Sequence, residues 1–132
     1  MFGLFKHGPK VPQEKALEWI RYFLENHNEG YFRLTCPDGK RFFQCWKNNG
    51  EVLSHFPNVD WFKPISEPVK LKAESYSFTC NILEPDPGVE FGFLEIDFGS
   101  DFKSLNEFTL WLLKEGFALE SKEKVRFRTR LQ

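Results

Sequence analysis

The spacing of apolar residues predicts a helix near the start of the chain. After Pro12, which suits the first turn of a helix, apolar side chains recur every three or four positions. Asn28 and Gly30 end this pattern, because both residues favour the turns that follow helices. Residues 1–11 are expected to form a loose lead-in. The apolar stripe comprises Ala16, Leu17, Trp19, Ile20, Phe23 and Leu24.

A change to residue-by-residue alternation predicts three strands after this helix. The alternating segments are residues 31–36, 41–47 and 52–56. Asp38-Gly39 and Asn49-Gly50 stand between them, and both pairs favour tight hairpin turns. The three segments are therefore expected to form an antiparallel meander.

The next part of the chain predicts a loop and two strands. Several prolines between residues 57 and 68 predict a loop. Residues 69–82 have the composition of a strand, with a change of alternation near Glu74 that predicts a bulge. Residues 89–98 form an apolar run, which is expected of a central strand buried on both faces.

A second helix and a last strand complete the predicted fold. Asp101 or Ser104 can cap the helix, and Gly116 can end it. Residues 125–131 alternate again and predict a strand. The order α-β-β-β-β-β-α-β with tight turns predicts a single α+β domain over residues 1–132, with two helices packed on a mainly antiparallel sheet of about six strands. Its expected core is Trp19, Ile20, Phe23, Phe32, Leu34, Phe43, Phe93, Leu105, Phe108 and Leu112.

The amino-acid composition limits the classes of protein to which the chain can belong. The chain is 41% hydrophobic and 28% charged, which is typical of a globular domain, and 16 of its residues are Phe. The net charge is −1, so the chain lacks the broad basic field that is typical of nucleic-acid-binding domains, and a nucleic-acid partner is not expected. Cys36, Cys45 and Cys80 show neither a disulfide framework nor zinc-ligand spacing, so all three thiols are expected to stay unbridged. Without a recognisable signal peptide or membrane span, the expected location is the cytoplasm.

The charges are unevenly distributed along the chain. Residues 81–102 contain six acids and no base, whereas residues 122–130 contain five bases and one acid. Glu95 and Asp97 are expected to pair with arginines 126 and 128 across strands. The outer acids are expected to meet a basic protein partner. These outer acids are Glu84, Asp86, Glu90 and Asp101.

The two turns also predict which side chains share a face of the sheet. Centring the first hairpin on Asp38-Gly39 makes paired residue numbers sum to 77, and centring the second on Asn49-Gly50 makes them sum to 99. One face then carries a mixture of aromatic and hydrogen-bonding groups that is typical of recognition surfaces. The alternative is that the second helix or the 57–68 loop covers this face. The candidate binding residues are Tyr31, Arg33, Phe42, Gln44, Trp46 and His55, with Trp61 from the loop.

The sequence contains no recognisable catalytic, metal-binding or cofactor motif. We therefore favour a non-enzymatic protein-binding module, such as an inhibitor or immunity-type protein that neutralises a toxin. A secretion-type chaperone, a single-stranded nucleic-acid-binding domain, and a small ligand-binding protein or enzyme that uses His55 are the alternatives.

Overall fold

The chain folds as an antiparallel sheet with helices on one side. The computed structural model describes residues 8–131, in which seven strands form one sheet in the order β1-β7-β2-β3-β4-β6-β5. Every neighbouring pair of strands is antiparallel. This confirms the α+β class, although the expectation of about six strands and two helices fell short by one of each. The strands are β1 (Lys10–Pro12), β2 (Gly30–Thr35), β3 (Phe42–Asn48), β4 (Glu51–Asn58), β5 (Thr79–Leu83), β6 (Gly92–Gly99) and β7 (Lys124–Leu131).

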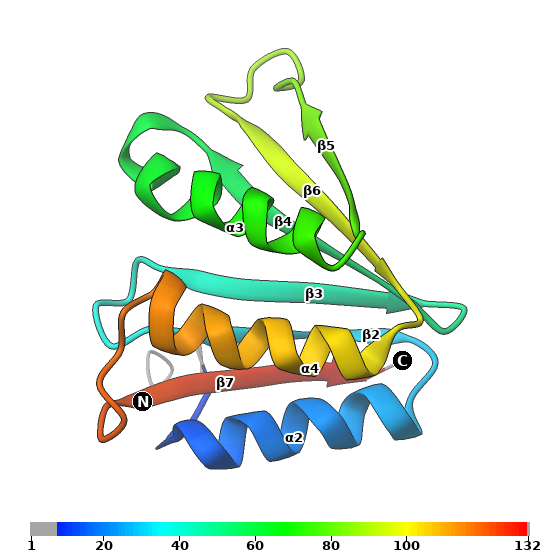
Figure 1. Cartoon of the computed structure of the whole chain (residues 1–132), viewed down its shortest axis with the longest axis vertical. Coiled ribbons are helices and arrows are strands. Elements are labelled where there is room, and N and C mark those ends of the chain that lie inside the picture. The colour runs from blue at the N-terminus through cyan, green and yellow to red at the C-terminus, as the bar shows by residue number, and fades with distance from the viewer. Residues whose placement is uncertain (1–7, 132) are drawn as a thin grey trace.

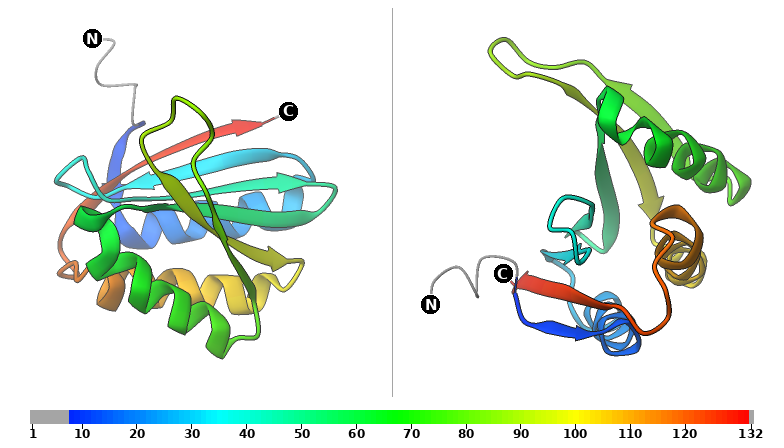
Figure 2. Two further views of the ribbon diagram at one scale, coloured as in Figure 1. Left: turned by 90° about the horizontal axis from the view of Figure 1, so that it is seen from above. Right: turned by 90° about the vertical axis from the view of Figure 1, so that its left-hand side faces the viewer.

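Three helices cover one face of the sheet. They are α2 (Gln13–Asn26), α3 (Lys63–Ser75) and α4 (Phe102–Trp111), which Figure 1 labels, and a wide turn over Leu112–Gly116 continues α4. The right-hand view of Figure 2 shows all three helices on the same side of a strongly curved sheet. The opposite face, which we call the open face, therefore has no helix from the described residues over it.

The helix α3 corrects two predictions from the sequence. The predictions of a loop over residues 57–68 and of a strand over residues 69–82 are wrong, because β4 extends to Asn58. The short helix η1 (Asp60–Phe62) follows, and α3 continues to Ser75. Pro64 stands in the first turn of α3, where a missing backbone N–H costs little, and Pro68 lies inside the helix. The change of alternation near Glu74 marks the end of a helix, not a bulge. The following strand, β5, begins at Thr79.

The place of β7 in the sheet corrects a third prediction. This strand lies between β1 and β2, whereas β6 lies between β4 and β5. Glu95 and Asp97 on β6 are therefore not cross-strand neighbours of Arg126 and Arg128 on β7. Lys10 and Val11 of the expected lead-in belong to β1, as does Pro12, which was expected to begin the helix, and residues 1–7 lie outside the described part of the chain.

Aromatic rings dominate the packing between the sheet and the helices. The Phe43 ring lies 5.7 Å from Phe32, 5.7 Å from Phe56 and 6.1 Å from Phe108, measured between centroids. Eight of the ten residues expected in the core are buried. Trp19 is 37% exposed at the edge of α2, and Phe93 is half-buried because it belongs to the open face.

All three cysteines are unbridged, which confirms that prediction. Cys36 and Cys45 are buried on the helix side of the sheet, and Cys80 is half-buried. No helix in residues 8–131 combines the length and the apolar composition needed to cross a membrane.

Candidate functional site

The registers predicted from the two turns are confirmed, and they build the open face. Tyr31 pairs with Trp46 and Arg33 with Gln44, so residue numbers sum to 77 across β2 and β3. Trp46 also pairs with Leu53, so numbers sum to 99 across β3 and β4. Gly39 and Gly50 adopt φ values of 73° and 79°, which glycine reaches without strain.

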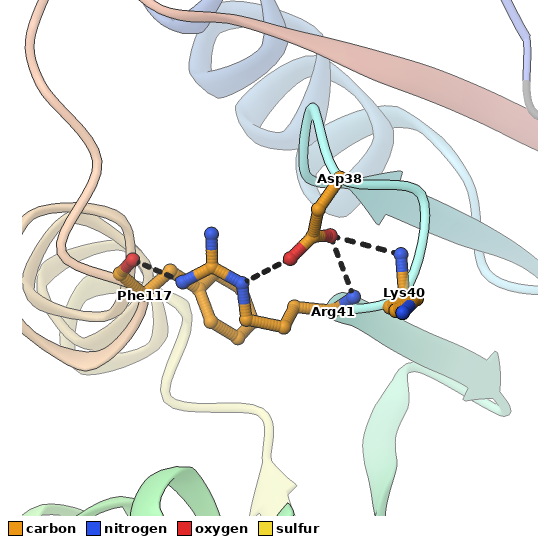
Figure 3. A network of polar contacts seen from close by, with 4 residues as sticks. All are labelled: Asp38, Lys40, Arg41 and Phe117. Atoms are coloured by element: carbon orange, nitrogen blue, oxygen red, sulfur yellow. Dashed lines mark hydrogen bonds and ion pairs between the residues drawn. The ribbon is translucent and has the colours of Figure 1, made fainter.

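A polar network fixes the first turn to the end of the α4 region. The Asp38 carboxylate accepts hydrogen bonds from the backbone N–H groups of Lys40 (2.8 Å) and Arg41 (3.1 Å), and from Nε of Arg41 (2.7 Å). The Arg41 guanidinium also donates to the carbonyl oxygen of Phe117 (Figure 3). This network holds the β2–β3 register on which the arrangement of the open face depends.

The open face is accessible along its middle. Trp46 is 38% exposed and Leu53 is 37% exposed. Phe62 of η1 approaches Phe42 at one end of the face, with 6.4 Å between the ring centroids. The alternative that the second helix or the 57–68 segment covers the whole face is therefore wrong for the described residues.

A polar row crosses this face from β7 to β5. Arg33 stands opposite Arg128 on one side and Gln44 on the other. Farther along, Glu95 stands between His55 and an asparagine of β5. Basic groups therefore occupy the β7–β2 half of the face, whereas a carboxylate occupies the β6 half.

His55 is held in place by contacts on three sides. Its Nε2 lies 2.8 Å from a carboxylate oxygen of Glu95, and its ring lies 5.2 Å from the Trp46 ring and 5.5 Å from the Phe93 ring. The sheet registers place no Ser or Cys on the open face within residues 8–131, so the His–Glu pair has no such nucleophile beside it. The same residues contain no group of three metal-ligating side chains.

Arginines gather at the β7–β2 half of the open face. The Arg33 guanidinium stacks on the Phe42 ring at 4.0 Å from its centroid. Arg128 and Arg130 lie over the Tyr31 ring at 5.6 and 5.9 Å. Burial and the neighbouring positive charge of Arg128 lower the pKa of Arg33.

The outer acids are divided between two ends of β6. Glu84, Asp86 and Glu90 are exposed in the loop that joins β5 to β6. Asp101 lies beyond the other end of the eight-residue strand, about 25 Å away at the usual strand rise. Its carboxylate caps α4 by accepting a hydrogen bond of 3.1 Å from the backbone N–H of Ser104.

Trp61 belongs to η1, apart from the aromatic side chains of the sheet. Its side chain is 56% exposed, with its ring 5.2 Å from that of Phe62. The adjacent residue Asp60 and the acids Glu84 and Glu90 line one hollow at this end of the molecule. Trp61 is therefore next in sequence to a residue that shares a hollow with acids of the β5–β6 loop.

Comparisons with protein families, with curated proteins and with solved structures found no match to this chain.

The sequence placed the arginines of β7 beside Arg33 only in the nucleic-acid alternative and not among the candidate protein-binding residues. Their alternation is visible in residues 125–131, but alternation does not reveal which strand lies next to β7. The pairing of β7 with β2 brings Arg126, Arg128 and Arg130 beside the predicted residues Tyr31 and Arg33. A prediction of strand order would have been needed to find them.

Proposed function

We propose that the protein is a non-enzymatic protein-binding module of the inhibitor or immunity type, which neutralises a partner such as a toxin by occupying its surface. The observation that supports this proposal is the helix-free face of the sheet. Flat aromatic rings and guanidinium groups share this face, and such residues are enriched at the centres of protein interfaces. Trp46 lies in its accessible middle and is the expected anchor.

The contacts of the open face favour binding over chemistry. The His55 ring lies between two aromatic rings and next to Glu95, so it is oriented, but it has no Ser or Cys beside it on the described face. The aromatic side chains offer a broad contact area with few rotatable bonds, which limits the entropy lost on association. The face is therefore suited to holding a folded partner.

The acidic loop supplies a second part of the proposal. Glu84, Asp86 and Glu90 project from one end of the molecule, beyond the sheet. Exposed acids raise the rate at which a basic partner arrives, with little effect on how long it stays. A cytoplasmic location belongs to the same proposal, because three unbridged thiols are compatible with a reducing compartment.

Affinity capture with matched variants tests the role of the open face. We expect Trp46→Ala to reduce recovery of a stoichiometric partner at least about tenfold, which is the loss typical of an aromatic anchor. Tyr22→Ala is the control, because Tyr22 is exposed on α2 on the helix side of the sheet. Equal recovery with both variants would overturn the proposal for this face.

Association kinetics test the acidic loop. The triple variant Glu84→Gln, Asp86→Asn, Glu90→Gln should slow association about tenfold at low salt and flatten its dependence on ionic strength. Trp46→Ala should instead speed dissociation. A matched triple variant of exposed acids on α2, Glu14→Gln, Glu18→Gln, Glu25→Gln, should leave the association rate unchanged. An unchanged rate in the loop variant as well would remove the acidic loop from the proposal.

A further inference from the structure

We propose that the β7–β2 half of the open face is a carboxylate-binding site that receives an acidic segment of the partner protein. This inference rests on the proposed function and specifies the partner's chemistry. Arg33, Arg128 and Arg130 are the proposed donors, and Tyr31 and Trp46 provide the apolar surface beside them. The partner's acidic segment lies over β7 and β2, toward the edge of the sheet opposite the acidic β5–β6 loop.

The sheet register concentrates positive charge on this half. Even-numbered residues of β7 share the open face, because Arg128 is paired with Arg33 and Arg130 with Tyr31. Arg126 and Lys124 continue the same parity, and Lys10 stands opposite Arg126 on β1. Like charges on opposed strand positions repel each other. An anionic partner would weaken that repulsion.

Arg33 has an unused donor at the centre of the arrangement. Its Nε is buried and donates no hydrogen bond within the described part of the chain. None of the salt bridges found among those residues includes Arg33. A carboxylate entering between Arg33 and Arg128 would supply an acceptor and separate the two positive charges. Arginine suits this role because its planar fork matches a carboxylate in two parallel hydrogen bonds.

A hollow adjoins the arginines and provides room for the partner's side chains. It has a volume of about 700 Å³. Arg128 and Arg130 line one side and Glu29 adds one carboxylate, whereas Tyr31, Trp46 and Leu53 provide apolar surface. The hollow therefore fits a segment in which acidic residues alternate with apolar or aromatic ones.

The charge distribution favours an acidic peptide over a nucleic acid. Asp97 stands opposite Leu53, and Glu29 lines the hollow together with Leu53, so carboxylates bound the basic strip. From β2 to β6 the strip spans three strand spacings, about 15 Å at the usual value. A strip of this width suits a short peptide with a few acids, whereas a strand of nucleic acid carries a phosphate at every residue and depends on a broad basic field.

A titration monitored by NMR at the arginine Nε–Hε groups tests the site directly. The probe is a hexaglutamate peptide, and the expected result is a saturable shift of the Arg33 and Arg128 signals. Arg33→Gln and Arg128→Gln should each weaken binding of the peptide about tenfold. Arg21→Gln is the matched control, because Arg21 is exposed on α2, and it should bind as tightly as the wild type.

Three results of the peptide titration would overturn the proposal. The first is the absence of any shift at Arg33, and the second is equal weakening by Arg21→Gln. The third is binding of hexathymidylate at least about tenfold tighter than hexaglutamate through the same signals, which would show a nucleic-acid site. If Arg33→Gln retains the captured partner whereas Trp46→Ala loses it, the acidic-segment proposal fails and the proposed function stands.

Discussion

Successive residues of each strand point to opposite faces of the sheet, and different interactions stabilise the two faces. On β3, Phe43 is fully buried and contacts aromatic rings from β2, β4 and α4. Its neighbours Phe42 and Gln44 point to the open face and remain half-buried. A single step along the backbone therefore separates a fully buried residue of the core from residues that stay partly exposed on the open face.

The two faces contribute differently to folding stability. The helix side removes apolar surface from water, which is the dominant stabilising contribution to folding. The open face instead places Arg33 opposite Arg128, where the two like charges repel each other. Substitutions on the two faces should therefore have opposite consequences for stability and for partner binding.

The largest expected loss of stability comes from removing a large aromatic side chain on the helix side of the sheet. Phe43→Ala should lower the free energy of unfolding by about 3–5 kcal/mol, because a cavity remains among the surrounding rings. Phe42→Ala, one residue away on the open face, should cost roughly 1 kcal/mol. Urea denaturation of both variants measures the difference. Equal losses would mean that the open face is as important to folding as the core.

The next largest effect on stability is expected from ionisation of the Cys36 thiol, which is buried on the helix side of the sheet. Burial raises the pKa of Cys36 to about 12. In the unfolded chain a thiol ionises near pH 8.5. Between about pH 8.5 and 12 the unfolded chain therefore binds fewer protons than the folded protein, and stability falls as pH rises. The slope attributable to one thiol approaches about 1.4 kcal/mol per pH unit.

Cys36→Ala should make this alkaline slope shallower by about 1 kcal/mol per pH unit between about pH 9.5 and 11. Cys80→Ala is the control, because Cys80 is half-buried and should produce a smaller change. Urea denaturation across this pH range gives both slopes. If the two variants behave alike, the difference in burial between the two thiols does not govern their ionisation.

The core was easier to predict from the sequence than the open face. The Asp-Gly and Asn-Gly pairs fixed both registers, so the division of β2, β3 and β4 between two faces could be derived from local turn chemistry. Strand order could not be derived, because β7 pairs with β2 across about 90 residues of intervening chain and no local pattern specifies that contact. The arginine cluster depends entirely on this pairing.

The helix α3 was missed for a different reason. Pro64 and Pro68 are usual breakers of regular structure, and the sequence between them is short. Packing of Val69 and Ala73 against the core stabilises the helix despite Pro68. Tertiary contacts therefore overrode a local signal.

A smaller effect is expected from the charged centre of the open face. Arg33→Gln should change the free energy of unfolding by less than about 1 kcal/mol, because the loss of stacking on Phe42 is offset by relief of the repulsion from Arg128. Thermal or urea denaturation at low salt measures this change. A loss above about 3 kcal/mol would show that Arg33 is a structural residue of the sheet, which would remove the contrast between the faces.

The smallest expected effect concerns the hydrogen-bonded pair on the open face, His55 and Glu95. Both side chains are about one-quarter exposed (28% and 24%), and their nitrogen and oxygen atoms lie 2.8 Å apart. Pairs that remain in contact with water usually contribute less than about 1 kcal/mol, because solvent screens the attraction and both side chains lose rotational freedom. A double-mutant cycle with His55→Gln and Glu95→Gln should therefore give a coupling energy below about 1 kcal/mol near pH 6.

The cycle distinguishes two descriptions of the open face. If the polar row is available for a partner, its members are weakly coupled and can exchange their contacts for new ones at low cost. A coupling energy above about 2 kcal/mol would instead indicate a rigid internal network, since strongly coupled polar groups are expensive to separate. His55 would then resist rearrangement on association, and the binding surface would have to lie nearer Trp46 and the arginines of β7.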